Sequence, residues 1–428
     1  MAAEQELPPD VRRNVPRNGL LLVGGSGLQS SGDQTVNAST VLPWLFHVLG
    51  VPPQLIGLLV PIRESGSMLP QAFLTPLILK VKYRKHVFAA GSLVQAASVA
   101  GMALTAAWAT GLIAGVLILL LLAVFSLGRC LCSIASKDVQ GRTGPKGERG
   151  QINGLSTTAA GLVAITLGLG IRLLGGEDLG VPQLVGLLLL GAVFWVGSVA
   201  LYMAVREPAD EDAGSEEDEA EEEAPNWLTQ SWELLRDDVP FRHFVTVRSL
   251  LLVSSLSPPF IVALSTGSGS QGLGGLGSFV IASGVAALLG GRLFGRWADK
   301  SSKSLMSFGA AAASVVICAI VAAVSLPGFD GRSWWGTGIF VLGYFLLALL
   351  HTGVRVGRKT YVVDMAEGDK RTAYVAVSNS AMGVILLVVG AVSSALASFG
   401  IPFALVFLAG MGVTGVFFSL RLPDVSRG

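Results

Sequence analysis

The chain has 428 residues, of which 51% are hydrophobic and only 14% are charged, and its net charge is +1. Soluble domains usually carry about 25% charged residues, so this composition excludes an ordinary water-soluble fold. The mean hydropathy is +0.63. Apolar windows of about 20 residues recur along the chain, and each is long enough to cross a hydrocarbon core of about 30 Å as a helix. The composition therefore predicts an all-α membrane protein.

We predict twelve transmembrane helices in two six-helix, pseudo-symmetric bundles. In chain order the predicted spans are 18–49, 53–79, 86–108, 111–136, 153–175, 181–205, 241–265, 273–297, 304–326, 334–360, 372–397 and 401–420. The two bundles are then residues 18–205 and 241–421. Residues 1–17 and 422–428 are expected to be cytoplasmic tails, and residues 206–240 an acidic cytoplasmic linker with a surface helix.

Acidic residues are concentrated between the two halves, at residues 207–223. This run holds eleven acids, and without them the chain has 18 acids against 30 bases. Most bases lie on alternate loops, whereas only Arg172 and Arg332 lie near loops of the other side. The positive-inside rule then predicts a multi-pass protein of the cell's inner (plasma) membrane, with both termini and the linker cytoplasmic. The run is typical of a disordered linker, with a regulatory or partner-binding role as the alternative. Residues 227–235 have helical apolar spacing that is typical of a membrane-surface helix.

An offset of 226 residues superimposes the two halves near their fourth spans. It aligns Arg129 with Arg355 and Asp138 with Asp364, and each segment leads out of a span into a basic loop. Weak internal symmetry of this kind is typical of transporters built from repeated halves.

The loop after the eighth predicted span reads Gly295-Arg-Trp-Ala-Asp-Lys300. This fragment resembles the Gly-x-x-x-Asp-(Arg/Lys) signature of the major facilitator superfamily, in the position expected for the second half. The resemblance implies the fold of that superfamily and transport by alternating access without an ATP site. The first half departs from the pattern, because residues 80–85 keep the bases and lack the acid. The fifth span has no proline in residues 161–176, which argues against a proton-coupled multidrug antiporter.

Polar residues recur along the first predicted span at steps of three and four residues: Ser26, Gln29, Ser30, Asp33 and Asn37. They therefore share one helical face, which cannot face lipid. The face either hydrogen-bonds neighbouring helices or lines a water-filled substrate cavity. In the second case Gln29, Asp33 and Asn37 are substrate-binding residues.

Arg63 and Glu64 lie near the middle of the second predicted span, where each charge costs roughly 2.5–3.5 kcal/mol. Adjacent helical residues point about 100° apart, so each needs a partner from another helix. We expect Arg63 to pair with Asp33, which leaves Glu64 or Asp33 to take up and release a coupling ion, H+ or Na+. The alternative is a buried ion pair that only fixes helix packing.

Arg129 and Arg355 occupy equivalent places in the two halves, with Ser133 and Lys359 one turn further along. Two cations at the same depth would hold an anionic substrate group between the halves. The alternative is that these cations snorkel to the headgroups and pair with loop acids. His351, one turn before Arg355, is either a substrate contact or a packing residue.

Asp299 of the signature fragment is expected to act at a gate. Its carboxylate can accept hydrogen bonds from Arg355 or Arg358 and face a helix N-terminus, which would close the cytoplasmic side.

These features predict a secondary active transporter for a small solute, with an anionic solute as the more specific expectation. The alternative is a non-transporting membrane receptor or assembly factor with the same fold. We expect a monomer in contact with lipid, without cofactor or nucleic-acid partner. An enzyme is not expected, because no nucleophile–base pair is recognisable. A metal site is not expected either, because the four histidines and Cys130, Cys132 and Cys318 lack ligand spacing.

Overall fold

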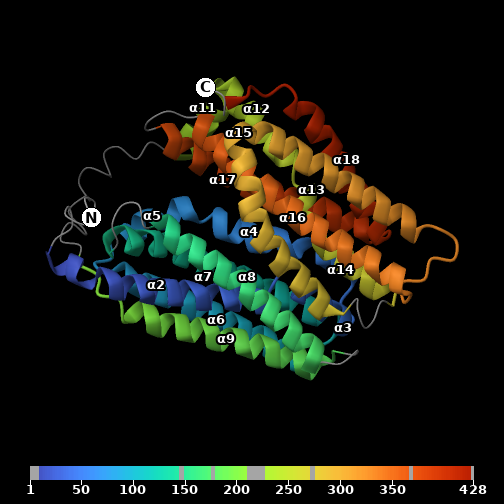
Figure 1. Ribbon diagram of the computed structural model, residues 1–428, viewed down its shortest axis with the longest axis horizontal. Coiled ribbons are helices and arrows are strands. Elements are labelled where there is room, and N and C mark those ends of the chain that lie inside the picture. Colours follow the sequence, from blue (N-terminus) through green and yellow to red (C-terminus); the bar gives the residue numbers. More distant parts are fainter. Residues whose placement is uncertain are drawn as a thin grey trace.

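Every regular element in the described part of the chain is a helix (Figure 1). The computed structural model describes residues 9–143, 149–174, 179–209, 227–269, 275–365 and 370–425. Most of the acidic run 207–223 lies outside these residues, so its role as a linker stays a prediction.

The helices of the first half are α2 (Pro9–Thr35), α3 (Val41–Val48), the 3-10 helix η1 (Pro53–Leu58), α4 (Leu59–Met68), α5 (Gln71–Leu79), α6 (Arg84–Trp108), α7 (Gly111–Thr143), α8 (Arg149–Leu174) and α9 (Val181–Met203). Those of the second half are α11 (Trp227–Asp237), α12 (Val239–Leu250), α13 (Val253–Leu256), α14 (Pro258–Gly267), α15 (Leu276–Val324), α16 (Trp334–Met365), α17 (Lys370–Ala397) and α18 (Ile401–Ser419).

Eight helical stretches within the described ranges are long and apolar enough to cross a membrane. The chain is therefore a multi-pass membrane protein. Shorter apolar helices cover residues 158–173 and 276–291. The exact number of twelve spans is not confirmed. The first two predicted spans are divided into several helices, and they carry the charged residues Asp33, Arg63 and Glu64. These helices are therefore too short or too polar to be counted among the eight.

The first predicted span is interrupted between α2 and α3. The carbonyl of Asn37 accepts a hydrogen bond from the Leu42 N–H at 3.0 Å, and its side-chain oxygen accepts one from the Ser39 N–H at 2.8 Å. Asparagine side chains compete with the helix for backbone N–H groups, and the side chain of Asn37 favours a turn at this position. Asn37 therefore lies in a turn, and the expectation that it continues the polar helical face is wrong. The helix also begins at Pro9, well before the predicted start of the span at residue 18.

The eighth and ninth predicted spans are two helical segments of α15, which is bent at Ser301. Ser301 has extended backbone angles, φ −166° and ψ 96°. Its hydroxyl accepts a hydrogen bond from the Ser304 N–H at 3.2 Å and donates one to Asp424 Oδ2 at 2.9 Å. The predicted loop is therefore reduced to one non-helical residue, and the Gly295–Lys300 fragment is helical.

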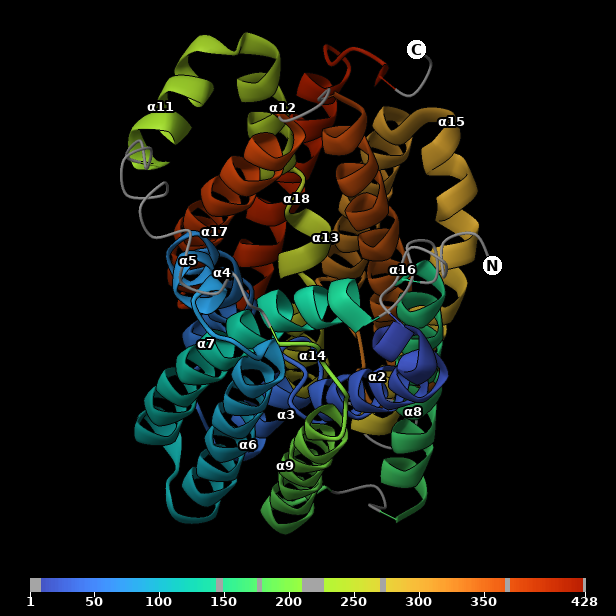
Figure 2. The same ribbon diagram turned by 90° about the vertical axis from the view of Figure 1, so that its left-hand side faces the viewer.

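The helices form two packed groups (Figure 1, Figure 2). In the first group α6 packs on α7 and α9, α2 on α8 and α9, and α4 on α7. In the second group α15 packs on α16 and α18, and α17 packs on α12 and α18. The groups meet along two main seams, α8 with α15 and η1–α4 with α17, and α3 also packs on α14. At the first seam a Cβ added to Gly168 would lie 2.8 Å from the carbonyl oxygen of Gly277, so the backbones approach closely because glycine stands there.

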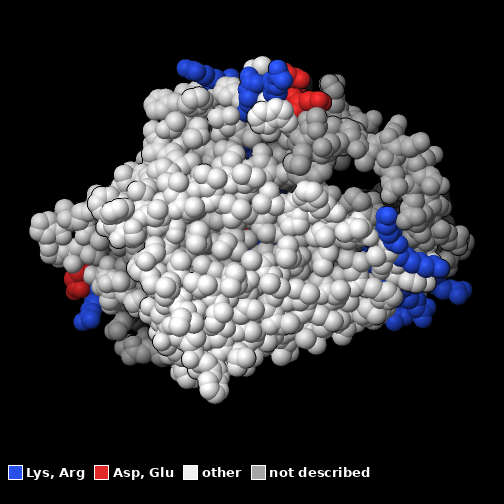
Figure 3. Space-filling model, turned by 180° about the vertical axis from the view of Figure 1, so that it is seen from behind, with Lys and Arg blue, Asp and Glu red and all other residues white. Residues whose placement is uncertain are grey.

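The outer surface carries little charge. Seen from behind, the molecule has a broad face of uncharged residues, and the visible Lys, Arg, Asp and Glu side chains gather at its margins (Figure 3). Large apolar side chains are exposed on the outside of many helices, including Leu117, Val193 and Phe417. Such a surface is expected to contact hydrocarbon rather than water, because exposed apolar area of this extent is unfavourable in water.

Candidate functional site

Asp33 of α2 holds two arginines from neighbouring helices. Its Oδ1 accepts hydrogen bonds from Arg63 Nη2 of α4 at 3.1 Å and from Arg129 Nη1 of α7 at 2.9 Å. Its Oδ2 accepts a second contact from the same Arg129 nitrogen at 2.8 Å. The expected Asp33–Arg63 pair is therefore present. Arg129 is a further partner of Asp33 that the sequence did not indicate.

This trio of charges remains partly accessible although Arg63 and Arg129 lie near the middle of α4 and α7, and Asp33 lies in the last turn of α2. The exposed fraction of the side chain is 21% for Asp33 and 30% for Arg129, against 11% for Arg63. Charged groups at this depth are very unfavourable against lipid, so their accessible surface must face a hydrated space. The accessibility favours the interpretation that the polar face of α2 lines a cavity.

Glu64 follows Arg63 on α4, but its carboxylate is not engaged in the same way. No hydrogen bond or ion pair joins this half-buried carboxylate to any other described residue; Ser67 bonds only to the Glu64 carbonyl, at 2.8 Å. Three arginines lie within its electrostatic range: Arg63, Arg129 and, from α16 of the second group, Arg358. Glu64 can therefore gain or lose an ion without breaking an ion pair.

Helix α16 of the second group contributes three basic side chains, Arg355, Arg358 and Lys359, that form no ion pair within the described ranges. They interact repulsively with one another. His351, on the same helix, has a buried Nδ1 without a hydrogen-bond partner. Lys137 of α7 also lies within electrostatic range of Lys359, across the two groups. The result is a local excess of positive charge on this side of the molecule.

The two aligned arginines have different environments. Arg129 is bound to Asp33, whereas Arg355 is exposed and has no acidic partner in the part of the chain that the structure describes. A clamp of two equivalent, uncompensated cations is therefore not what the geometry provides. Any anion contact by Arg129 would compete with Asp33, while Arg355 is available.

Arg248 of α12 belongs to the same region, and the sequence analysis did not select it. Its Nη1 donates to Ser378 Oγ at 2.8 Å and its Nη2 donates to Asn379 Oδ1 at 2.9 Å, both on α17. The residue is only 9% exposed, its Nε has no partner, and Arg358 lies within electrostatic range. A charged residue several turns inside the predicted span 241–265 was the available signal, similar to the one that singled out Arg63 and Glu64.

The remaining predicted substrate residues of the first group lie on α2 and α7, the helices that carry Asp33 and Arg129. The Nε2 of Gln29 donates to the Oε1 of Gln95 at 3.5 Å, and Gln95 is fully buried on α6. Ser133 lies one turn after Arg129 on α7 and is half-buried. The substrate roles of Gln29 and Ser133 stay predictions.

Asp299 is exposed, and no contact joins it to Arg355 or Arg358 in this structure. Its gating role stays a prediction. In the first group the comparable region is held by other acids. Arg84 Nε lies 2.8 Å from Asp138 Oδ2, and the Glu207 carboxylate accepts hydrogen bonds from the backbone N–H of Arg84 at 3.0 Å. The acid that the first loop lacks is thus supplied from α7 and from the segment after α9.

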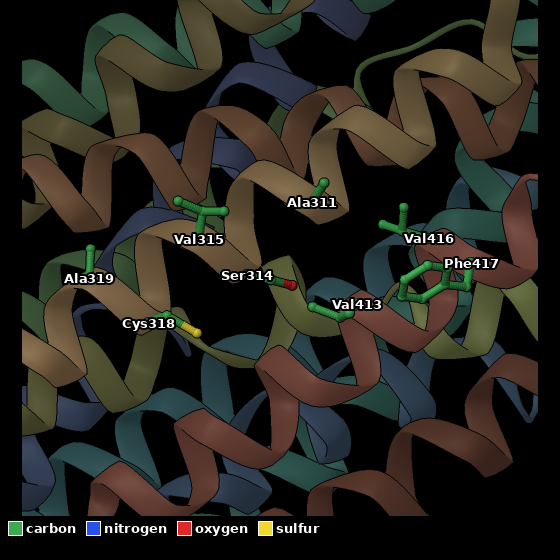
Figure 4. A pocket seen from close by; sticks show the side chains of 8 residues that line it. All are labelled: Ala311, Ser314, Val315, Cys318, Ala319, Val413, Val416 and Phe417. Atoms are coloured by element: carbon green, nitrogen blue, oxygen red, sulfur yellow. The ribbon is translucent and has the colours of Figure 1, made fainter.

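An apolar cavity of about 490 Å³ lies elsewhere, between α15 and α18 (Figure 4). Its lining consists of Ala311, Ser314, Val315, Cys318, Ala319, Val413, Val416 and Phe417. No charged side chain reaches it, so it offers nothing to hold a charged solute. The described residues contain no group of three or more His, Cys, Asp or Glu that could hold a metal ion.

Comparisons with known proteins agree with this arrangement. The family model "Major Facilitator Superfamily" matches residues 25–343. Among solved structures, the nucleoside transporter NupG has 14% identity and a TM-score of 0.66, and the match covers 95% of this chain and 98% of that chain. A POT family transporter in complex with a thioalcohol-conjugated peptide has 12% identity and a TM-score of 0.70, with 98% of each chain covered.

The inward open xylose transporter XylE from E. coli has 13% identity and a TM-score of 0.66, with 95% of this chain and 96% of that chain covered. No curated protein sequence matches the chain significantly. The structural likenesses, at these low identities, show the fold alone. The family model covers well over half of the residues, and its match shows that the chain belongs to the major facilitator superfamily.

Proposed function

We propose that the protein is a secondary active transporter that moves a small anionic solute by alternating access, coupled to an ion that binds at Glu64. Family membership supports transport as the general activity. The observation that carries the specific proposal is the unequal distribution of charge between the two helix groups. The first group holds Asp33, which compensates two arginines, and the unpaired Glu64, whereas Arg355, Arg358 and Lys359 on α16 of the second group have no ion-pair partner within the described ranges.

The excess of positive charge favours a negatively charged solute. Arg63 and Arg129 share one carboxylate, Asp33. The three α16 cations form no ion pair within the described ranges, and Glu64 acts on Arg358 only at longer range. A cavity lined by one sign of charge, with walls of low dielectric, concentrates ions of the opposite sign. An anion would lower the repulsion among these cations, whereas a cation would raise it.

Asp33 and Glu64 have different roles in this proposal. Asp33 is the permanent counter-charge of two arginines, so protonating it would leave both without a partner. Glu64 forms no ion pair with a described residue, and it lies within electrostatic range of Arg358 from the opposite helix group. With Glu64 ionised, attraction to Arg358 favours approach of the two groups. When H+ or Na+ neutralises Glu64, that attraction is lost, so ion binding can shift the balance between conformations.

The packing supports rocking of one helix group against the other. The groups contact each other along the α8–α15 and η1–α4–α17 seams, and glycines at the first seam allow the two backbones to approach each other closely. Transporters built from repeated halves alternate access largely by such rigid-body motion around a central site. The proposal includes twelve spans, a monomer in the plasma membrane, and cytoplasmic termini and linker.

The test is ion-coupled uptake by proteoliposomes that contain wild type, Glu64→Gln or Glu233→Gln. Radiolabelled phosphate, sulfate, succinate and lactate are offered under an imposed proton or sodium gradient. Wild type and the control Glu233→Gln, an exposed acid of α11, should accumulate a labelled anion. Glu64→Gln should lose accumulation but keep exchange of labelled for unlabelled anion, because exchange needs no net ion movement. Normal accumulation by Glu64→Gln would refute the assignment of Glu64.

A further inference from the structure

We propose that Arg248, Ser378 and Asn379, together with Arg358, form the binding site for a solute that carries more than one negative charge. This inference rests on the proposed function, because it names the substrate class and the place where the second helix group holds it. It shifts the site from a clamp between Arg129 and Arg355 to a cluster on α12, α16 and α17.

Arg248 is a buried cation without a counter-charge. It is 9% exposed, and its two hydrogen-bond partners, Ser378 and Asn379, are neutral. Arg84 is a useful contrast in the same chain. It is 1% exposed, but its guanidinium lies 2.8 Å from the carboxylate of Asp138. Buried charges in proteins are normally paired in the second way.

The neighbours of Arg248 orient its guanidinium and do not neutralise it. Ser378 and Asn379 each accept from one terminal nitrogen, and the Nε keeps an N–H without a partner. The charged group in its electrostatic range, Arg358, has the same sign and makes burial less favourable. Burial of an unpaired charge is costly, so an arrangement of this kind is best explained by a ligand that supplies the missing negative charge. Arginine is the side chain best suited to hold carboxylate or phosphate oxygens.

The number of cations indicates a solute with more than one charge. Arg355 precedes Arg358 and Lys359 follows it on α16, and none of the three has an ion-pair partner within the described ranges. Glu64 is the acid within electrostatic range of Arg358, and in the proposed function its carboxylate binds the coupling ion. One negative charge would leave most of this repulsion in place. A phosphate or a dicarboxylate would reduce it further.

The experiment measures anion-dependent stabilisation of the purified full-length protein in detergent. Inorganic phosphate, succinate and acetate are added at constant ionic strength, at a pH where phosphate is mainly divalent. Phosphate or succinate should raise the unfolding temperature of the wild type in a saturable way, and acetate should not. Arg248→Gln should weaken the apparent affinity for the stabilising anion by about ten- to hundred-fold, since a hydrogen bond to a charged group is lost.

Two further variants keep the test decisive. Arg84→Gln removes the buried arginine that has an acidic partner, so it should lower the unfolding temperature without anion and keep the anion-induced rise. Arg248→Gln removes an uncompensated charge, so it should not lower the unfolding temperature without anion. It should, however, lose the anion-induced rise. If Arg248→Gln does not fold, Arg248→Lys is used. It keeps the charge and loses the fork of donors, so its anion affinity should fall below that of the wild type.

The inference is wrong if Arg248→Gln, or failing that Arg248→Lys, binds phosphate and succinate as the wild type does. It is also wrong if acetate stabilises the wild type equally well, or if none of these anions does. Uptake separates this failure from failure of the proposed function. Accumulation of lactate that requires Glu64 would keep the transporter and remove the polyvalent site. Binding of phosphate or succinate that depends on Arg248, without any uptake, would keep the site and remove the transporter.

Discussion

Replacing Asp33 with Asn should destabilise the protein strongly, because one carboxylate compensates two arginines. In the wild type, Asp33 contacts Arg63 at 3.1 Å and Arg129 at 2.8 Å. Asp33→Asn leaves both guanidiniums without an acid at a depth where unpaired charge is unfavourable. Glu64 lies in their electrostatic range, but it makes no ion pair with either and cannot replace the missing contacts without rearrangement.

The magnitude follows from the burial of the pair. Removing one partner of a buried ion pair costs about 3–5 kcal/mol. Asp33 and Arg129 are 21% and 30% exposed, so water screens part of the lost interaction. We therefore expect a decrease of about 2–3 kcal/mol in the free energy of unfolding. The second change Arg129→Gln restores the charge balance of the trio and should recover at least half of this decrease.

The assay is equilibrium unfolding of the purified variants in mixed detergent micelles. Glu64→Gln is the matched control, since it makes the same change of acid to amide one residue from Arg63, where no ion pair is broken. It should unfold like the wild type. Two results would refute the reasoning: an Asp33→Asn variant as stable as the wild type, or a double variant less stable than Asp33→Asn alone.

Two other predictions concern the helix seam and the orientation in the membrane. Gly168→Val at the α8–α15 seam should reduce stability by about 1–3 kcal/mol and slow transport, because a Cβ there would lie 2.6 Å from Ile281 Cγ1. Gly170→Val on the same helix has open space and should behave as wild type in the same unfolding and uptake assays. A cysteine at Asp330 should react with an impermeant thiol reagent from outside intact cells, and one at Ser215 should not. Labelling at Ser215 from outside would reverse the proposed topology.

The parts of the site that the sequence predicted are those for which depth in the membrane is decisive. Asp33 and Arg63 both fall near the middle of apolar spans, where each needs a partner of opposite charge, and the structure joins them at 3.1 Å. The membrane class followed from composition for the same reason, since the solvent determines which residues can be exposed.

The partner of Arg129 could not be predicted, because the pairing depends on distances between helices and the spacing of polar residues along one helix does not give these distances. Internal symmetry aligned Arg129 with Arg355 and suggested equivalent roles, but α7 packs where its arginine reaches Asp33. The helix break at Asn37 was missed for a related reason, because its local hydrogen bonds end α2 within a span that hydropathy alone would continue. The break predicted after the eighth span is present, but it is reduced to the single residue Ser301.

Arg248 was within reach of the sequence argument. It is a charge inside an apolar span, as Arg63 is, but no acid stood at a comparable depth in the second half to suggest a pair. The structure shows why this search fails: the partners of Arg248 are the neutral Ser378 and Asn379. A charge that lacks an acidic partner was therefore the more informative signal for ligand binding.

The most direct test of the central claim is accumulation of an anion against its own gradient by the reconstituted wild-type protein. Proteoliposomes are loaded with the anion that stabilises the purified protein, and the same anion is supplied outside at lower concentration. Both solutions have the same specific radioactivity, so that a rise in internal label reports net uptake and not exchange. Net uptake is then measured with and without an imposed proton or sodium gradient. The account predicts net accumulation that requires the gradient. Saturable binding without any net movement of the anion, under either gradient, would contradict transport and favour a receptor.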